Sequence, residues 1–451
     1  YGCGSLTTSL APNLAVLVLG WSLLEGIGAA LILPAIVALV ASNFGRAQRP
    51  RAYGLVASAG AIAVAAGPLI GGLFTTYLSW RLVVAGEVVI VLAILVLTRR
   101  IADAPPEPGT KLDLVGTLLS AAGLGLIVYG ILRSGSWGLV RPTAGAPEWL
   151  GLSPVIWLIL AGGVVLRTFV WWENRVLARD AEPLIDPARL ENPTLRGGLI
   201  AFFFQYLLQA GLFFAVPLFL SVALGLSAID TGVRILPLSI TLLLAAVGVP
   251  RFFPNASPRR VVQLGFLALF AGLVVLIAAL DAGAGPEIVT WPLLLAGLGV
   301  GALASQLGAV TVSSVPDEQS SEVGGLQNTL TNLGASIGTA LAGAVLISGL
   351  TSTFLTGIDA NPDVPDSVAE TATVELSSGI PFVSDAQLRD ALEDRGVPSS
   401  TADAIVDENV EARVVALRMS LGVMALLALI ALFFSRRIPR EPLTQAPVPA
   451  A

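Results

Sequence analysis

The chain has no histidine, one cysteine, two methionines and few charged residues. Without histidine there is no histidine-based zinc site, general base or proton relay. The lone cysteine, Cys3, excludes an internal disulfide and a cysteine-based metal site. No P-loop or dinucleotide-binding glycine loop is present either. We therefore expect no metal, no cofactor and no enzymatic activity.

Charge is scarce because apolar residues dominate. Of 451 residues 55% are hydrophobic and 12% are charged, whereas soluble domains carry about 25% charge. The mean hydropathy is +0.83. Apolar runs of membrane-spanning length recur along the chain, which predicts an all-α polytopic membrane protein with eleven complete spans and a partial one at 1–10. The predicted spans are 13–40, 53–77, 82–98, 114–132, 154–172, 197–221, 233–250, 261–280, 291–314, 325–350 and 414–435.

Basic residues alternate between the two sides of the predicted membrane. The loops at 41–52, 99–113, 173–196 and 251–260 and the tail after 435 hold 16 Lys or Arg, whereas the loops at 78–81, 133–153, 222–232 and 281–290 hold three. The richer side is predicted to be cytoplasmic. The C-terminus is therefore expected in the cytoplasm, and the chain in the plasma membrane of a prokaryote. One predicted cytoplasmic loop, VPDEQSSEVG at 315–324, has no basic residue.

The segment 351–412 is hydrophilic and acidic, and the same alternation places it outside. It carries 13 Asp or Glu against two Arg. The patches SDAQLRDALEDRG and STADAIVDENVEA are helix-like, and each opens with a candidate Ser or Thr cap. Two interpretations stay open, a solvated and partly helical cap without chemistry, or an acidic antechamber that concentrates cations.

The run 53–77 contains the glycine-rich stretch GAIAVAAGPLIGG. Small residues at Gly60, Gly67 and Gly71 share one helix face, with Gly72 beside it, so another backbone can approach closely. Pro68 removes a helix hydrogen bond and favours a kink. The alternative is ordinary tight packing, since both residue types are common in membrane helices.

Several stretches together resemble one transporter family. GPLIGG and the preceding EGIGAALILP are similar to its antiporter signature and to its fourth-helix pattern, and FGRAQRPRAYG and LSWR fit the adjoining loops. LSAIDTGVRILPLSI and VPDEQSSEVGGLQNTLTNLGASIGTALAGAVL match later regions. On these motifs the chain resembles the fourteen-helix drug:proton antiporter branch of the major facilitator superfamily over nearly its whole length.

The resemblance implies a two-bundle fold and a chain without the family's first two helices. It assigns 1–100 to the remainder of the first bundle and 101–196 to linkers and two extra helices. The second bundle would comprise 197–350 and 413–437, separated by the outer loop 351–412 and followed by a cytoplasmic tail at 438–451.

Glu25 and Glu87 depart from the family pattern, in which these positions are often Gln and Asn. Glu25 lies roughly 17 Å along its apolar run, near the middle of a bilayer core about 30 Å thick, where an ionised group costs on the order of 3 kcal/mol or more. Its helix face holds Trp21, Ser22, Gly28 and Ala29, and Ser22 replaces the family's arginine. We expect Glu25 to point inward, as a proton carrier or a structural carboxyl group. Glu87 can serve coupling too, or extend its side chain outward.

Two stripes of polar residues follow helical spacing in the second half. They can line a central substrate cavity, as the family resemblance implies, or only join neighbouring helices. The first lies on the predicted helix 197–221 and the second on 325–350. Their members are Gln205, Tyr206 and Gln209, and Asn328, Asn332, Ser336 and Thr339. Trp21 and Ser22 are further cavity candidates.

The sequence thus predicts a secondary transporter that exports a lipophilic, cationic drug in exchange for protons by alternating access. A same-fold transporter of a metabolite or siderophore is the alternative, and sodium remains an alternative coupling ion. The expected partners are a small-molecule substrate, protons and membrane lipid, with no nucleic acid and a monomeric chain.

Overall fold

A computed structural model describes residues 1–44, 49–99, 113–143, 145–179, 181–281, 283–315, 320–375 and 382–441. Within these ranges the protein is helical and forms no β-strand. The predicted linker at 101–112 and the last part of the predicted tail, 442–451, lie outside the described residues.

Ten helices among the described residues are long and apolar enough to cross a membrane. They cover every predicted complete span except 53–77, which is covered by α4, a continuous helix of 29 residues with Pro68 inside it. The predicted all-α membrane architecture is confirmed.

The first part of the chain forms a group of helices in which α1 crosses the long second helix. That second helix, predicted as one span at 13–40, contains a π-helical segment. It begins after Asn13, whose side chain accepts a hydrogen bond from the Val16 N–H at 3.0 Å. The elements are α1 Gly2–Ser9, α2 Leu14–Val18, η1 Leu19–Glu25, α3 Gly26–Asn43, α4 Arg49–Tyr77 and α5 Trp80–Thr98.

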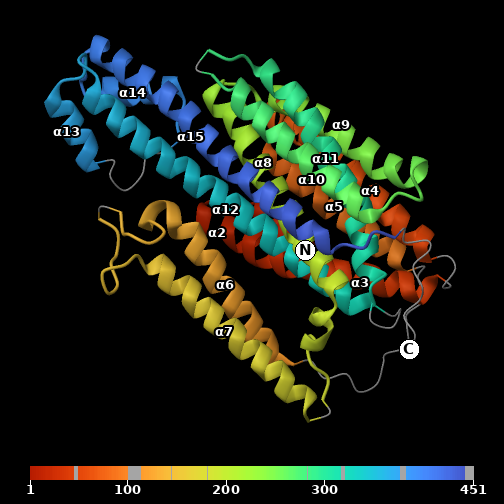
Figure 1. Cartoon of the computed structure of the whole chain (residues 1–451). Helices are drawn as coiled ribbons and strands as arrows, with labels where there is room; N and C mark the ends of the chain where they lie inside the picture. Colours follow the sequence, from red (N-terminus) through yellow and green to blue (C-terminus); the bar gives the residue numbers. More distant parts are fainter. Residues whose placement is uncertain are drawn as a thin grey trace.

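An antiparallel hairpin follows, made of α6 (Leu114–Trp137) and α7 (Pro154–Leu177), drawn in orange and yellow in Figure 1. Glycines seven residues apart on α6 let the two helices touch. A Cβ at Gly162 of α7 would lie 2.7 Å from the carbonyl oxygen of Gly123 on α6. The hairpin lies along α12, and a Cβ at Gly135 would come within 2.9 Å of the Ala344 backbone.

The second bundle holds the main apolar core. Buried Leu, Phe and Val side chains such as Phe266, Leu269 and Leu303 fill the space between its helices. A Cβ at Gly334 would lie 2.4 Å from the Phe203 carbonyl oxygen, so α12 and α8 are in backbone contact. The helices are α8 Pro193–Leu218, η3 Phe219–Ala223, α9 Ala228–Phe252, α10 Pro258–Ala279, α11 Thr290–Val312, α12 Ser320–Ala360 and α15 Ser399–Phe434.

The two groups of helices meet where α4 packs on α9. The Thr76 hydroxyl accepts a hydrogen bond from the Ile229 N–H at 3.0 Å. A Cβ at Gly72 would lie 2.6 Å from the Ala228 carbonyl oxygen, and a Cβ at Gly232 would lie 2.5 Å from that of Pro68. The glycine-rich helix therefore contacts the second bundle at close range.

The segment 351–412, predicted to lie outside and called the outer segment below, is more helical than its composition predicts. Helix α12 continues to Ala360 and α15 begins at Ser399, so two membrane helices extend into it side by side, with α13 (Asp366–Glu375) and α14 (Asp385–Asp394) at their end (Figure 1). The predicted Ser cap of the first patch is confirmed, because Ser384 forms a capping box with Gln387. The cap predicted for the second patch is wrong, since that patch is the start of α15, which follows Pro398 without a side-chain cap.

Candidate functional site

Glu25 ends the π-helical segment and is 7% exposed. It is covered by α1, because glycines remove the side chains that would hold the helices apart. A Cβ at Gly4 would lie 2.6 Å from both the Cγ and the backbone nitrogen of Glu25, and a Cβ at Gly20 would lie 2.6 Å from the Thr8 hydroxyl. Single π turns inside α-helices are frequent at functional sites. Glu25 is thus held inside the bundle, as predicted.

The two sequence-predicted carboxylates share one environment. The Ser5 hydroxyl donates a hydrogen bond to Glu87 Oε2 at 3.0 Å, and the hydroxyls of Ser5 and Thr8 lie beside the Glu25 carboxylate. Within the described part of the chain, Glu25 Oε1 and the Thr8 hydroxyl are buried without a hydrogen-bond partner. The site is therefore a pair of carboxyl groups around Ser5, and one carboxyl oxygen, Glu25 Oε1, can still accept a hydrogen bond.

Sequence reasoning missed the contribution of α1. Ser5 is fully buried between Glu87 and Glu25. The sequence predicts only a partial span at 1–10 and no functional residue in it. Arg81 of the LSWR motif fixes this helix in place, since its guanidinium donates to the carbonyl oxygens of Ser9 at 2.9 Å and Ala11 at 2.7 Å. The pattern of small and hydroxyl residues in YGCGSLTTSL was the available signal.

The predicted helix face around Glu25 is wrong for Trp21 and Ser22 and right for Gly28. Trp21 is 57% exposed and Ser22 is exposed, whereas Glu25 is buried. The face that contacts α1 consists of Gly20, Glu25 and Gly28. A π turn bonds residue i to i+5 instead of i+4, so the residue that joins Glu25 under α1 is five positions earlier, not four. The cavity role of Trp21 and Ser22 stays a prediction.

The polar stripes are brought together where α8 packs on α12. Gln205 is 2% exposed, and its Oε1 has no hydrogen-bond partner among the described residues. Tyr206 stacks on Phe202 with ring centroids 6.0 Å apart.

The remaining members of these stripes are less enclosed. Gln209 and Asn328 are half-buried, and Asn332 is exposed. The Asn332 amide donates to the backbone oxygen and to Oδ1 of Asn328, at 2.9 and 3.0 Å. The two asparagines therefore bond to each other along one helix, while Gln205 points into the packed bundle.

The glycines of the signature differ in what they contact. Gly72 and Pro68 lie against α9, whereas a Cβ at Gly60, Gly67 or Gly71 would meet no described atom within 4 Å. The close approach predicted for the face of Gly60, Gly67 and Gly71 is thus made instead by the adjacent face of α4. Their functional roles stay predictions.

The comparison with known families agrees with this architecture. The sequence profile described as the Major Facilitator Superfamily matches residues 1–339. The chain belongs to the Major Facilitator Superfamily. Solved structures of the superfamily's fold include a bacterial homologue of the human lysosomal transporter Spinster, with a TM-score of 0.54, 16% identity, and coverage of 99% of this chain and 83% of that one.

Curated relatives of this superfamily member are named for drug resistance. The lincomycin resistance protein LmrB of Listeria monocytogenes is 26% identical and covers 77% of this chain and 70% of its own length. The tetracenomycin C resistance and export protein of Streptomyces glaucescens is 27% identical, with coverage of 78% and 62%. The puromycin resistance protein of Streptomyces alboniger is 28% identical, with coverage of 80% and 69%. The chain thus spans about two thirds of the length of these relatives.

Proposed function

We propose that this superfamily member is a secondary transporter that exports a lipophilic, cationic drug in exchange for protons. The observation that carries the proposal is the carboxyl pair around Ser5, a buried Glu25 and a half-buried Glu87, inside the first group of helices. The resistance names of the relatives support a drug as the substrate. A buried carboxyl group can be neutralised by a proton or by a cationic substrate, which makes the two ligands compete.

The neighbouring basic group is already engaged elsewhere. The Arg81 guanidinium donates to two backbone oxygens at the end of α1 and lies over the Trp80 ring at 4.9 Å. Among the described residues no Arg or Lys forms an ion pair with Glu25, so in this proposal the counter-charge of Glu25 comes from what enters the site. The two bundles would move about the α4–α9 contact, so that the site opens to each side of the membrane in turn.

The test is efflux of ethidium from proteoliposomes under an imposed proton gradient. We expect Glu25→Gln to lower proton-driven efflux at least tenfold, because an amide cannot exchange the proton. Glu148→Gln, in an exposed loop outside the site, is the matched control and should transport like the wild type.

The outcome also identifies the coupling ion. A wild-type rate for Glu25→Gln would remove Glu25 from the mechanism. Efflux driven by a sodium gradient alone would replace the proton with sodium. Failure of the wild type to move ethidium or other lipophilic cations, with transport of a metabolite or siderophore, would overturn the substrate assignment.

A further inference from the structure

A second pair of carboxylates, a half-buried Asp113 and a buried Glu173, lies far along the chain from Glu25, where α6 begins and α7 ends. Asp113 is the N-cap of α6, and Glu173 lies in the last turns of α7 with no exposed surface. A Cβ at Gly116 would collide with Glu173 Oε1 and with Asp113 Oδ2, so both oxygens border the same point. The absent side chain of Gly116 allows the two groups to face each other.

Asp113 has the hydrogen bonds that an ionised carboxylate needs. Its Oδ1 accepts from the backbone N–H groups of Val115 at 3.1 Å and Gly116 at 3.0 Å. Its Oδ2 accepts from the Trp172 indole N–H at 2.8 Å. Three donors and a helix N-terminus favour the negative charge on this side chain.

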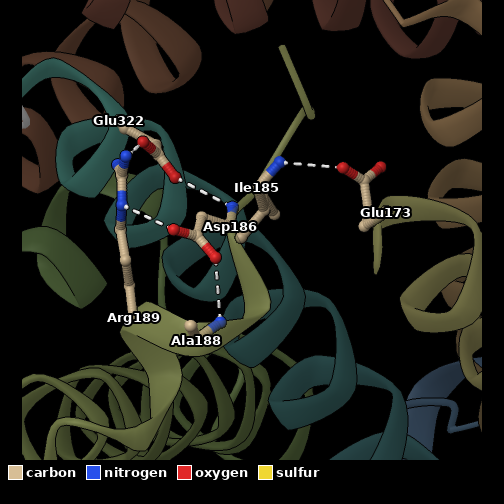
Figure 2. A network of polar contacts seen from close by, with 6 residues as sticks. All are labelled: Glu173, Ile185, Asp186, Ala188, Arg189 and Glu322. Carbon is tan, nitrogen blue, oxygen red and sulfur yellow. Dashed lines mark hydrogen bonds and ion pairs between the residues drawn. The ribbon is translucent and has the colours of Figure 1, made fainter. Parts of the chain in front are cut away.

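Glu173 lacks such support. Its Oε2 accepts one hydrogen bond, from the Ile185 N–H at 3.2 Å, and Figure 2 shows the other carboxyl oxygen without a bond. That oxygen, Oε1, is buried and has no partner among the described residues. A second negative charge here would have no cation beside it among the described residues and would face the ionised Asp113, which a buried site does not tolerate.

We propose that Asp113 and Glu173 form a proton-binding site, with one proton on Glu173 Oε1 that is donated to Asp113 Oδ2. Asp113 is the titratable side chain that faces Glu173 from α6, Trp172 is its neighbour on α7, and the segment before α8 presents backbone N–H groups. A divalent metal fits poorly, because calcium takes six to eight oxygens and magnesium an octahedron, whereas three N–H donors already occupy three of the four lone-pair sites of Asp113 and leave one for the Glu173 proton.

The proton-binding site is connected to α12 by hydrogen bonds and ion pairs of the segment 185–189. Next to Ile185, the Asp186 N–H donates to Glu322 Oε1 of α12 at 3.3 Å. Arg189, in the short helix η2 (Pro187–Glu191), forms ion pairs with Glu322 and, at 3.5 Å, with Asp186 (Figure 2). Loss of the proton would set two like charges side by side and would make the hydrogen bond from the Ile185 N–H charge-assisted, because an ionised carboxylate accepts more strongly than a neutral carboxyl group. The attachment of this segment to the hairpin therefore depends on pH at the predicted cytoplasmic side.

Infrared spectroscopy of the purified protein at neutral pH tests the site. A protonated carboxyl group has its own C=O stretching band, and we expect Glu173→Gln to remove one such band from the wild-type spectrum. Asp113→Asn should remove it too, although Glu173 is still present, because the amide N–H donates to Glu173 Oε1 and allows it to ionise. Glu182→Gln, an exposed residue three positions before Ile185, should leave the band unchanged.

Hydrogen exchange of the Ile185 amide gives a second readout. After correction for intrinsic rates, its protection should rise with pH in the wild type, as Glu173 loses its proton, and stay constant in Glu173→Gln. An unchanged infrared spectrum in Glu173→Gln would overturn the proposal, as would a band that persists in Asp113→Asn. Stoichiometric binding of Ca²⁺ or Mn²⁺ that Glu173→Gln abolishes would assign the pair to a metal instead. These results do not depend on efflux through Glu25.

Discussion

At the scale of single residues, the burial of Glu25 depends on the glycines that face it. A Cβ at Gly4 would lie 2.6 Å from the Glu25 backbone nitrogen, a distance that side chains cannot adopt without a shift of α1. We expect Gly4→Ala to destabilise the protein by about 1–3 kcal/mol, the typical cost of overpacking, and to disturb the carboxyl pair.

The matched control is Gly26→Ala, next to Glu25 in the long second helix that α1 crosses. No described atom lies within 4 Å of its added methyl group, and alanine favours a helix over glycine by up to about 1 kcal/mol. The unfolding temperature measured in detergent should therefore fall for Gly4→Ala and rise for Gly26→Ala, each relative to the wild type. Equal unfolding temperatures for Gly4→Ala and the wild type would mean that α1 does not pack on Glu25 as described.

The sequence predicts part of this site well. A lone carboxylate near the middle of an apolar run must face inward because lipid cannot solvate it, and Glu25 does so. Its approach to Glu87 was not predictable, because it depends on Ser5 in a short helix and on a π turn that no spacing rule signals. Helical periodicity assumes i, i+4 neighbours. The π turn breaks this spacing, so Trp21 does not lie on the same helix face as Glu25.

At the scale of elements, the outer segment is held to the membrane helices by a buried arginine. Arg413 of α15 is 1% exposed, donates to the Val383 carbonyl oxygen at 3.0 Å and pairs with Asp385 at the start of α14. We expect Arg413→Gln to cost about 1.5–3 kcal/mol, the range for hydrogen bonds to charged groups, and to release α14.

A nearby exposed ion pair provides the comparison. Arg389 Nη2 lies 2.7 Å from Asp403 Oδ1, and the two side chains are 45% and 62% exposed. Arg389→Gln should therefore cost less than about 1 kcal/mol of stability. Hydrogen exchange in 384–394 should rise strongly for the first variant and little for the second. The same exchange in both would show that burial of Arg413 contributes nothing to docking.

Helix extension explains why composition misjudged this segment. The first patch has a local signal, the Ser384 capping box, and it was found. The start of α15 at Ser399 has no such local signal. Its polar first turns are stabilised instead by buried residues such as Ile405 and Ala412, which pack on the rest of the core. A hydropathy window ends a span where the membrane ends, whereas the helix continues as long as it has a partner.

At the scale of the whole molecule, the hairpin α6–α7 is attached to the second bundle at both ends. Gly135 packs on Ala344 of α12, and the segment 185–189 links Glu173 to Glu322 (Figure 2). This accounts for the predicted cytoplasmic loop without a basic residue. Its acidic Glu322 pairs with Arg189, 133 positions earlier, a contact that only the fold provides.

A double-mutant cycle measures how much this attachment stabilises the molecule. Arg189→Gln and Glu322→Gln each remove one partner, while the amide at 322 can still accept the Asp186 N–H. Because both side chains are about three-quarters buried, we expect the pair to show a coupling energy of about 0.5–3 kcal/mol in unfolding experiments. The double variant should therefore be more stable than the sum of the single effects predicts. Strict additivity would mean that the hairpin is held by helix packing alone, through contacts such as that of Gly135 with Ala344.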